Sequence, residues 1–243
     1  MRERYGALYY LGVGGLFVLI GMLSLFGWGA WTLRSVWVHV YVLHDASQTE
    51  DDRVEAAYAL GQDGRVNQRQ LWDIAMRKPL PTLARYVVAE SLTGEAATAD
   101  PEGYGASVSK SEEWPVWLRL LLTRPMAYCA ALNLPVARGS LAELKKNPDH
   151  AIALWATYAL AAGSEGDPAE SAALRREAKT EGLDRKLAEL LVGALDTRDL
   201  AERLKELDKA TRWLRLNHPV CAEVWKGWRM DGDRVVREKG AGK

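Results

Sequence analysis

Asp52-Arg-Val-Glu-Ala-Ala-Tyr-Ala-Leu-Gly61 is the stretch on which the predicted fold depends. Its small alanines share one face, a leucine closes the last turn and a glycine follows, so a second helix can pack closely against it. Just upstream, Ser47-Gln-Thr-Glu50 has the form of a capping box, and the acids Asp51 and Asp52 suit the positive end of a helix dipole. These signals predict a helix that starts after Ser47 and ends at Gly61.

The pattern returns in Ala84-Arg-Tyr-Val-Val-Ala-Glu-Ser-Leu92. When the two copies are aligned, Arg85 takes the place of Arg53, and Leu92 takes the place of Leu60. Equivalent positions in stacked repeats face equivalent neighbours. We therefore expect Arg53 and Arg85 to reach the same kind of partner, a carboxylate or a helix-end carbonyl group in an adjoining turn.

Further copies of the pattern are looser. Ile152-Ala-Leu-Trp-Ala-Thr-Tyr-Ala-Leu160 keeps the alanines and the final leucine without the arginine, and weaker echoes end at Leu132 and Leu195. The closing leucines at 60, 92, 132, 160 and 195 are separated by 32, 40, 28 and 35 residues, about 34 on average. A period of this size is typical of stacked helical hairpins, each of which buries its apolar face on the next.

The first three copies resemble HEAT-like repeats, whose short form reads Val-Arg-x-x-Ala-Ala-x-Ala-Leu-Gly. The resemblance covers residues 50–95 and 148–165; it departs from the family at Asp52, where an apolar residue is usual, and in the third copy, which lacks the arginine. It implies a curved right-handed stack that binds proteins and performs no catalysis. The expected fold is all-α: one N-terminal transmembrane helix, then an α-solenoid of HEAT-like helical hairpins.

The predicted transmembrane helix is the run Tyr5 to Leu33, which has no charged side chain. A helix of this length reaches about 43 Å at about 1.5 Å per residue, and a bilayer's hydrocarbon core is about 30 Å thick. A cleaved signal peptide is the alternative, but its apolar region is about half as long. We therefore expect a retained anchor.

Aromatic residues near both ends of this run suit the membrane–water interface. The candidates are Tyr5, Tyr9, Tyr10, Trp28, Trp31 and Trp37. Ala7, Gly14 and Gly21 are spaced seven apart, so they lie within about 40° of one another on a helical wheel. This shallow stripe is a candidate packing surface for another membrane helix, although membrane helices also tolerate glycine in general.

Charge sets the expected orientation and limits the partners. Arg2 and Arg4 precede the apolar run and Arg34 follows it closely, which places the N-terminus in the cytoplasm and the large domain on the extracytoplasmic (periplasmic) side of a bacterial membrane. The whole chain has 32 Lys+Arg and 32 Asp+Glu, so no strong field attracts nucleic acid. A nucleic-acid partner is therefore not expected.

Residues 35–44 alternate valine with other side chains, which favours a strand, but no turn residue separates them from the helix before. We expect the helix to continue through them. His39 and His44 are weak candidates for a pigment, haem or metal ligand. Five residues apart on a helix they lie about 140° from each other, so they would not grip one ion. No cofactor or metal is expected.

Residues 94–113 are rich in Gly, Ala, Ser and acids and predict a long loop. Ser107-Val-Ser-Lys110 within it matches the Ser-x-x-Lys of serine acyl-enzymes, without the companion motifs. Cys129 and Cys221 form no disulfide framework; they could pair, but buried free thiols are favoured.

Later segments are charged. The run from Asp196 to Leu216 predicts an amphipathic helix or helix pair with a solvated charged face, and Asp167 with Pro168 predicts another helix start. His218-Pro-Val-Cys221 predicts a helix break followed by a capping segment with tryptophans. The basic tail after it predicts disorder.

The expected organisation is a flank (1–4), the transmembrane helix (5–33), a juxtamembrane segment (34–49), a helical-repeat domain with little or no sheet (50–228) and a basic tail (229–243). The function favoured by this organisation is that of a non-catalytic accessory or scaffold subunit of a larger photosynthetic, respiratory or transport complex. Its partners would be integral membrane subunits, a soluble protein domain and membrane lipid. The alternatives are a subunit that carries a pigment or haem on His39 or His44, and a membrane-bound hydrolase that uses Ser107 and Lys110.

Overall fold

The computed structural model describes residues 22, 34–111, 113–163, 165–232 and 234–238. The predicted transmembrane helix 5–33 therefore lies outside the described residues, except for Met22. Within the described part of the chain, no helix is both long enough and apolar enough to cross a membrane. The undescribed candidates of this segment are Ala7, Gly14, Gly21, Tyr5, Tyr9, Tyr10, Trp28 and Trp31.

Most of the described chain is helical, as predicted, and its strands are confined to a short C-terminal hairpin. Residues 34–44 are helical, as predicted, and do not form a strand. The later helices are α2 (Glu50–Gln62), α3 (Gln68–Met76), α4 (Thr82–Glu90), α5 (Glu95–Thr98), α6 (Pro101–Ser109), α7 (Val116–Ala131), α8 (Arg138–Leu144), α9 (His150–Ala161), α10 (Pro168–Glu177), α11 (Arg185–Asp196), α12 (Leu200–Asn217) and α13 (Pro219–Val224). The strands are β1 (Trp228–Asp231) and β2 (Arg234–Arg237).

The start of α2 differs from the prediction. Thr49, not Ser47, is the N-cap, and its hydroxyl oxygen accepts a hydrogen bond from the Asp52 backbone N–H at 3.1 Å. Ser47 is instead held in the preceding turn, because its N–H and its hydroxyl both donate to the Asp45 carboxylate at 2.9 and 2.7 Å. Because Ser47 is bound to Asp45, the N-cap is Thr49, two residues after the predicted one.

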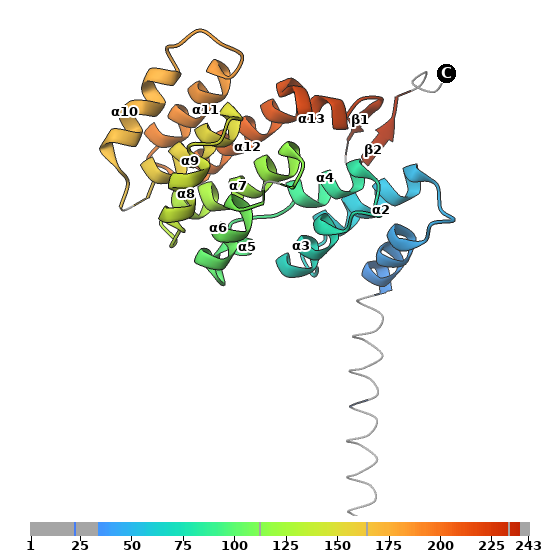
Figure 1. Ribbon diagram of the computed structural model, residues 1–243. Helices are drawn as coiled ribbons and strands as arrows, with labels where there is room; N and C mark the ends of the chain where they lie inside the picture. The colour runs from blue at the N-terminus through green and yellow to red at the C-terminus, as the bar shows by residue number, and fades with distance from the viewer. Residues whose placement is uncertain (1–21, 23–33, 112, 164, 233, 239–243) are drawn as a thin grey trace, which may run out of the picture.

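A central row of helices forms the middle of the molecule: α2, α4, α7, α9 and α11 pack on one another in that order. The remaining helices flank this row, with α3 against α4, α8 against α9 and α10 against α9 and α11 (Figure 1). Buried alanines let the row pack closely, as at Ala56, Ala57, Ala84 and Ala89. This stacking of helices fits an α-solenoid.

The segment 94–113 contains α5 and α6 and is not the predicted long loop. Asp100 caps α6 by accepting a hydrogen bond from the Gly103 N–H at 2.9 Å, and Pro101 occupies its first turn. Gly105 serves packing, because a Cβ at this position would stand 2.5 Å from the Ala137 Cβ, just before α8. The glycines that suggest a loop thus include one that allows helix contact.

The C-terminal segment from α12 to β2 (residues 200–237), here called the strap, folds back along the body. It contacts α11 and α7 through α12, then α4 and α7 through α13, and ends with β2 against α2 (Figure 1). The predicted disorder of the tail is therefore wrong for residues 229–232 and 234–237, which belong to an antiparallel hairpin that pairs Trp228 with Arg237. The hairpin is ordered where it docks on α2.

Candidate functional site

Arg53 and Arg85 make the same contact in neighbouring helix pairs. The Arg53 Nε donates to the Leu43 carbonyl at 3.0 Å, and the Arg85 Nε donates to the Ala75 carbonyl at 2.8 Å. Each acceptor lies ten residues before its arginine, in the last turn of the preceding helix. Carbonyl groups at a helix end lack an intrahelical partner, so each arginine ties one helix to the next.

The leucines and glycine of the pattern lie in the packed interior. Leu60, Leu92 and Leu160 are 0%, 3% and 6% exposed. Gly61 lies against α4: a Cβ at Gly61 would stand 2.2 Å from the Ser91 Oγ and 2.9 Å from its Cβ. Close approach of α2 to α4 therefore depends on the absence of a side chain at position 61.

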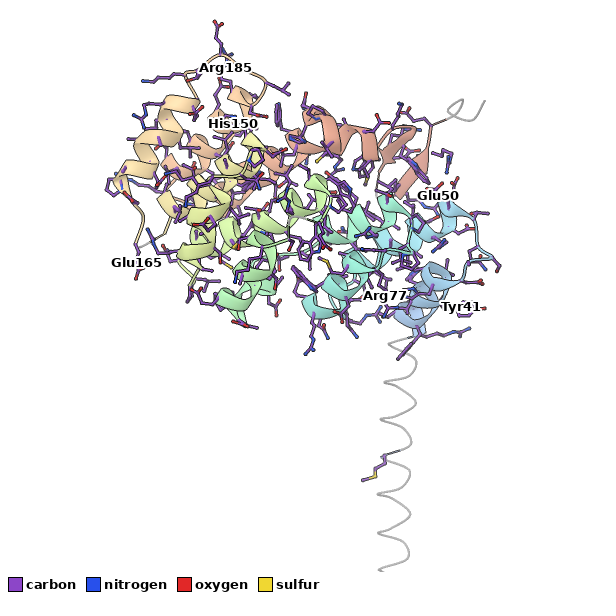
Figure 2. The ribbon with its side chains drawn as sticks, in the orientation of Figure 1. Tyr41, Glu50, Arg77, His150, Glu165 and Arg185 are labelled. Carbon is purple, nitrogen blue, oxygen red and sulfur yellow. The ribbon has the colours of Figure 1, made fainter. Side chains whose placement is uncertain are left out.

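Helix 34–44 is joined to the helical body and keeps one face exposed. Leu43 is fully buried, and Val36 and Val40 pack against the core. Trp37 and Tyr41, one turn apart, are each 67% exposed. The helix thus presents an aromatic stripe (Trp37 and Tyr41) to the surroundings while its other face belongs to the core. Figure 2 shows Tyr41 at the edge of the molecule.

The strap is held to the central row by a buried polar network around Arg124, which is 5% exposed. Its Nε donates to the Thr211 Oγ1 at 2.8 Å, and its Nη1 donates to the Glu90 carbonyl at 3.2 Å. The Glu90 carboxylate pairs with the Arg215 Nη2 at 3.0 Å. The sequence predicts that the charges of α12 face solvent. This prediction is wrong for Arg215, which faces inward to α4.

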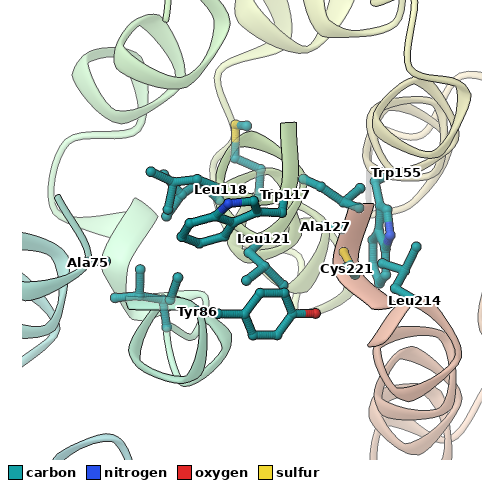
Figure 3. Packing of buried hydrophobic residues seen from close by; sticks show 14 of the residues in the cluster. Ala75, Tyr86, Trp117, Leu118, Leu121, Ala127, Trp155, Leu214 and Cys221 are labelled. Carbon is teal, nitrogen blue, oxygen red and sulfur yellow. The ribbon is translucent and has the colours of Figure 1, made fainter. Parts of the chain in front are cut away.

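Aromatic rings continue this junction. The Tyr86 ring lies 5.7 Å from Trp117 and 6.0 Å from Trp225 of the strap, measured between centroids, and the Arg215 guanidinium lies 4.9 Å above Trp225. Figure 3 shows Tyr86 beside Trp117, with its hydroxyl group toward Cys221 of the strap. The Tyr86 hydroxyl is buried, and burial raises the pKa of this side chain.

His218 anchors the start of α13. Its Nε2 lies 3.3 Å from the Asp149 Oδ2, and its side chain is 7% exposed. Burial alone would lower the pKa of His218, but its interactions with Asp149 and Cys221 outweigh that effect and raise the pKa to about 10. Asp149 also caps α9, because its carboxylate accepts from the Ile152 N–H at 3.2 Å. The strap is thus tied to the N-terminal end of α9.

Both cysteines are free and buried, which settles the question of their pairing. Cys129 donates its thiol hydrogen to the Gly94 carbonyl at 3.0 Å, and burial raises the pKa of this thiol to about 11. Cys221 interacts with His218, which in turn contacts Asp149, an arrangement that suits thiol chemistry. Its sulfur has no exposed surface, however, so no substrate reaches it in this conformation.

A surface groove opens between α3, α5 and α6, with a volume of about 770 Å³. Trp72 and Tyr104 line it, with ring centroids 5.0 Å apart, and Trp114 supports Trp72 from 5.9 Å. Polar residues at its edge include Arg69 and Glu95. The sequence does not reveal this groove, because two of its walls, α5 and α6, come from the segment predicted to be a loop.

The predicted ligand residues lie apart from this groove. The His44 Nε2 is 3.4 Å from the Arg77 Nη1, and the pKa of His44 is lowered by burial and by the charges of Arg77 and Arg53. A cationic metal would meet that positive charge. His39 lines a different surface hollow with Val38 and Asp52. Among the described residues, no group of three or more His, Cys, Asp or Glu side chains could hold a metal ion.

Of the predicted Ser-x-x-Lys pair, only Ser107 lies within α6. The Ser107 hydroxyl donates to the Gly103 carbonyl of its own helix at 2.8 Å, and Lys110 follows α6 on the surface. The serine hydrogen is therefore engaged with the backbone rather than with a base. The structure does not bring the two side chains together in a hydrogen bond.

Comparisons with protein-family models, with curated proteins and with solved structures found no match for this chain. The surfaces that remain as candidates are the aromatic groove, the exposed stripe of helix 34–44 and the contact between strap and row. All three are suited to contact with other molecules or with the rest of the chain.

Proposed function

We propose that this chain is a non-catalytic, membrane-anchored scaffold subunit of a larger membrane complex, and that its HEAT-like repeat body holds a soluble partner domain. The observation that carries the proposal is the firm attachment of helix 34–44 to the repeat body. Leu43 is fully buried and its carbonyl accepts from Arg53, so this helix and α2 act as one unit. The apolar run 5–33 directly precedes that helix.

The exposed aromatic stripe supports the position of the anchor. Trp37 lies four residues after Leu33, about 6 Å farther along a continuous helix. The polar layer on each side of a bilayer is about 5–7 Å thick, so Trp37 would lie within it. Tryptophan favours this layer, and its 67% exposure leaves the ring free for lipid contact.

The aromatic groove supports a protein partner for the body. Aromatic side chains with polar neighbours are enriched where proteins bind one another. A groove of about 770 Å³ that includes Trp72 accepts a few side chains of a partner rather than a whole domain. We assign the groove to the soluble partner and the glycine stripe of the anchor to membrane subunits.

The groove assignment is tested by a bulky residue in the groove of the full-length protein, purified in mild detergent. Ala99 is exposed and lines the groove, so Ala99→Arg should remove the soluble partner from the co-purified set. Ala142→Arg, at an exposed position of α8, is the matched control and should keep it. An identical set of partners in the two variants would contradict the assignment of the groove.

The anchor assignment has its own test. Gly14→Leu with Gly21→Leu should weaken co-purification of membrane subunits while membrane insertion persists, because close helix packing over small residues is lost. Gly12→Leu with Gly27→Leu is the control, since these positions face about 160–220° away from Gly14 on a helix. Unchanged co-purification in both double variants would mean that the anchor only tethers the body.

A further inference from the structure

The end of the strap is bound to the first turns of α2 by paired charges. The Arg237 Nε lies 3.0 Å from the Asp51 Oδ1, and its Nη2 lies 2.7 Å from the Glu50 Oε2. The Arg234 Nε donates to the Glu55 Oε1 at 2.9 Å. Three carboxylates of α2, here called the acidic edge (Glu50, Asp51 and Glu55), thus receive two guanidinium groups that lie three residues apart on one strand.

The contact also has an apolar part, because Trp228 and Val235 belong to the buried core. Val235, between the two arginines, is 4% exposed and is the buried side chain of β2. On β1, Trp228 lies beneath the Arg237 guanidinium, with 4.5 Å between the guanidinium carbon and the ring centroid. The contact therefore binds an extended basic segment in which an apolar residue lies between two arginines.

The ionic part of this contact is the part that another basic segment can replace. A two-stranded sheet by itself is marginally stable in water, so this hairpin depends on its docking to α2. The charged side chains of the contact remain 40–68% exposed, and exposed ion pairs are weak and are screened by salt. Opening of the hairpin would leave α12 in place, because its buried leucines belong to the core.

We propose that the acidic edge of α2 is a docking site for a basic extended segment of a partner protein, and that the hairpin occupies this site in the free chain. This inference rests on the proposed scaffold function and names the chemistry of one partner: two arginines that flank a small apolar stretch. A tethered segment has an effective concentration on the order of millimolar, so the hairpin excludes weak basic ligands and yields only to a stronger one.

The first experiment opens the site in the full-length protein by Arg234→Glu with Arg237→Glu. Hydrogen exchange should become at least tenfold faster in β1, β2 and the first turn of α2, and should stay unchanged in α7 and α9. Arg229→Glu is the matched control, because Arg229 pairs with Asp231 inside the hairpin and not with α2. Unchanged protection of the hairpin in the double variant would overturn the proposal that these charges hold it.

The second experiment uses a fluorescent peptide with the sequence of residues 228–238. Its affinity for the Arg234→Glu/Arg237→Glu protein should exceed its affinity for the wild-type protein at least tenfold, measured by fluorescence anisotropy. Glu50→Lys with Glu55→Lys should also free the hairpin but should not bind the peptide, because the acidic edge is gone. A peptide with both arginines changed to glutamate should bind none of the proteins.

These outcomes separate the inference from the proposed function. Equal binding of the peptide to all variants, or binding to none, would overturn the docking site without touching the groove or the anchor. Loss of partners from Ala99→Arg together with an inert acidic edge would leave the scaffold function standing. The reverse result would leave a basic partner at α2 and remove the groove assignment.

Discussion

The two ends of the strap are attached to the body in opposite ways. At α12, Leu207, Ala210 and Leu214 are fully buried, and the Thr211 hydroxyl accepts from the buried Arg124. At the hairpin, exposed arginines meet exposed carboxylates, and the buried apolar side chains among its described residues are only Val235 and Trp228. Full burial of a leucine contributes about 1.5–3 kcal/mol, whereas an exposed ion pair contributes about 0–1 kcal/mol. The difference teaches that buried leucines hold one end of the strap, whereas surface charges form much of the contact at the other end.

The largest effect expected is at the buried end. Leu214→Ala should lower the free energy of unfolding by about 2–5 kcal/mol, because it removes a fully buried side chain and leaves a cavity. Leu216→Ala, two residues on and 68% exposed, should change it by less than about 0.5 kcal/mol. Urea unfolding followed by circular dichroism measures both. Equal effects would show that α12 is not part of the core.

A smaller effect is expected for the polar network of the same end. Thr211→Val keeps the shape but removes the acceptor of the Arg124 Nε, so a buried charged donor loses its partner. The expected cost is about 1–3 kcal/mol in the free energy of unfolding. Pairing this change with Arg124→Met should cost less than the sum of the two single changes, because they share one interaction. Strict additivity would show that the hydrogen bond contributes little.

The His218–Asp149 contact gives the buried end a pH dependence. The pKa of His218 is raised to about 10, above the value of about 6.5 in an unfolded chain. Its contribution is therefore complete below pH 6.5 and is lost as pH rises toward 10. The pKa of Asp149 is lowered, so its own contribution is lost in acid. His218→Gln should cost about 1.5 kcal/mol near pH 6 and progressively less up to pH 10, by urea unfolding.

The smallest effect on stability is expected at the hairpin. Arg237→Ala should lower the free energy of unfolding by less than about 1 kcal/mol, because its partners Glu50 and Asp51 are exposed. Hydrogen exchange in β1 and β2 should nevertheless speed up, and the wild-type hairpin should lose protection between low and high salt. If the hydrogen-exchange rate of the hairpin changed neither with salt nor with this substitution, the two ends of the strap would not differ in how they are attached.

The helical character of the body could be predicted, because its pattern is local. The alanine and leucine positions of the first two copies define helices, and the structure gives Arg53 and Arg85 acceptors at the same spacing. Pro168 after Asp167 likewise starts a helix, with the carboxylate accepting from the Ala169 N–H. Patterns formed by residues close together in the chain, such as helix caps and helix faces, do not depend on contacts with distant segments.

The groove and the strap could not be predicted, because they depend on contacts between distant segments. Gly105 suggests a loop until α8 is placed beside it. Arg215 looks like one more charge on a solvated helix, and only its approach to Glu90, 125 residues earlier, turns it inward. The order of the tail likewise depends on α2, whose sequence gives no sign of a partner strand.

The strap also changes the mechanics of the molecule. An open array of repeats behaves as a spring, since each repeat touches only its neighbours and small rotations add along the stack. Here the strap runs from α11 back to α2, so bending that would open the row of helices must stretch the strap. A force transmitted through helix 34–44 acts first on α2, because Arg53 binds the Leu43 carbonyl. The strap is attached to this same helix by the exposed ion pairs of the hairpin. The body would be stiff under small forces and would become easier to bend once the hairpin separates from α2.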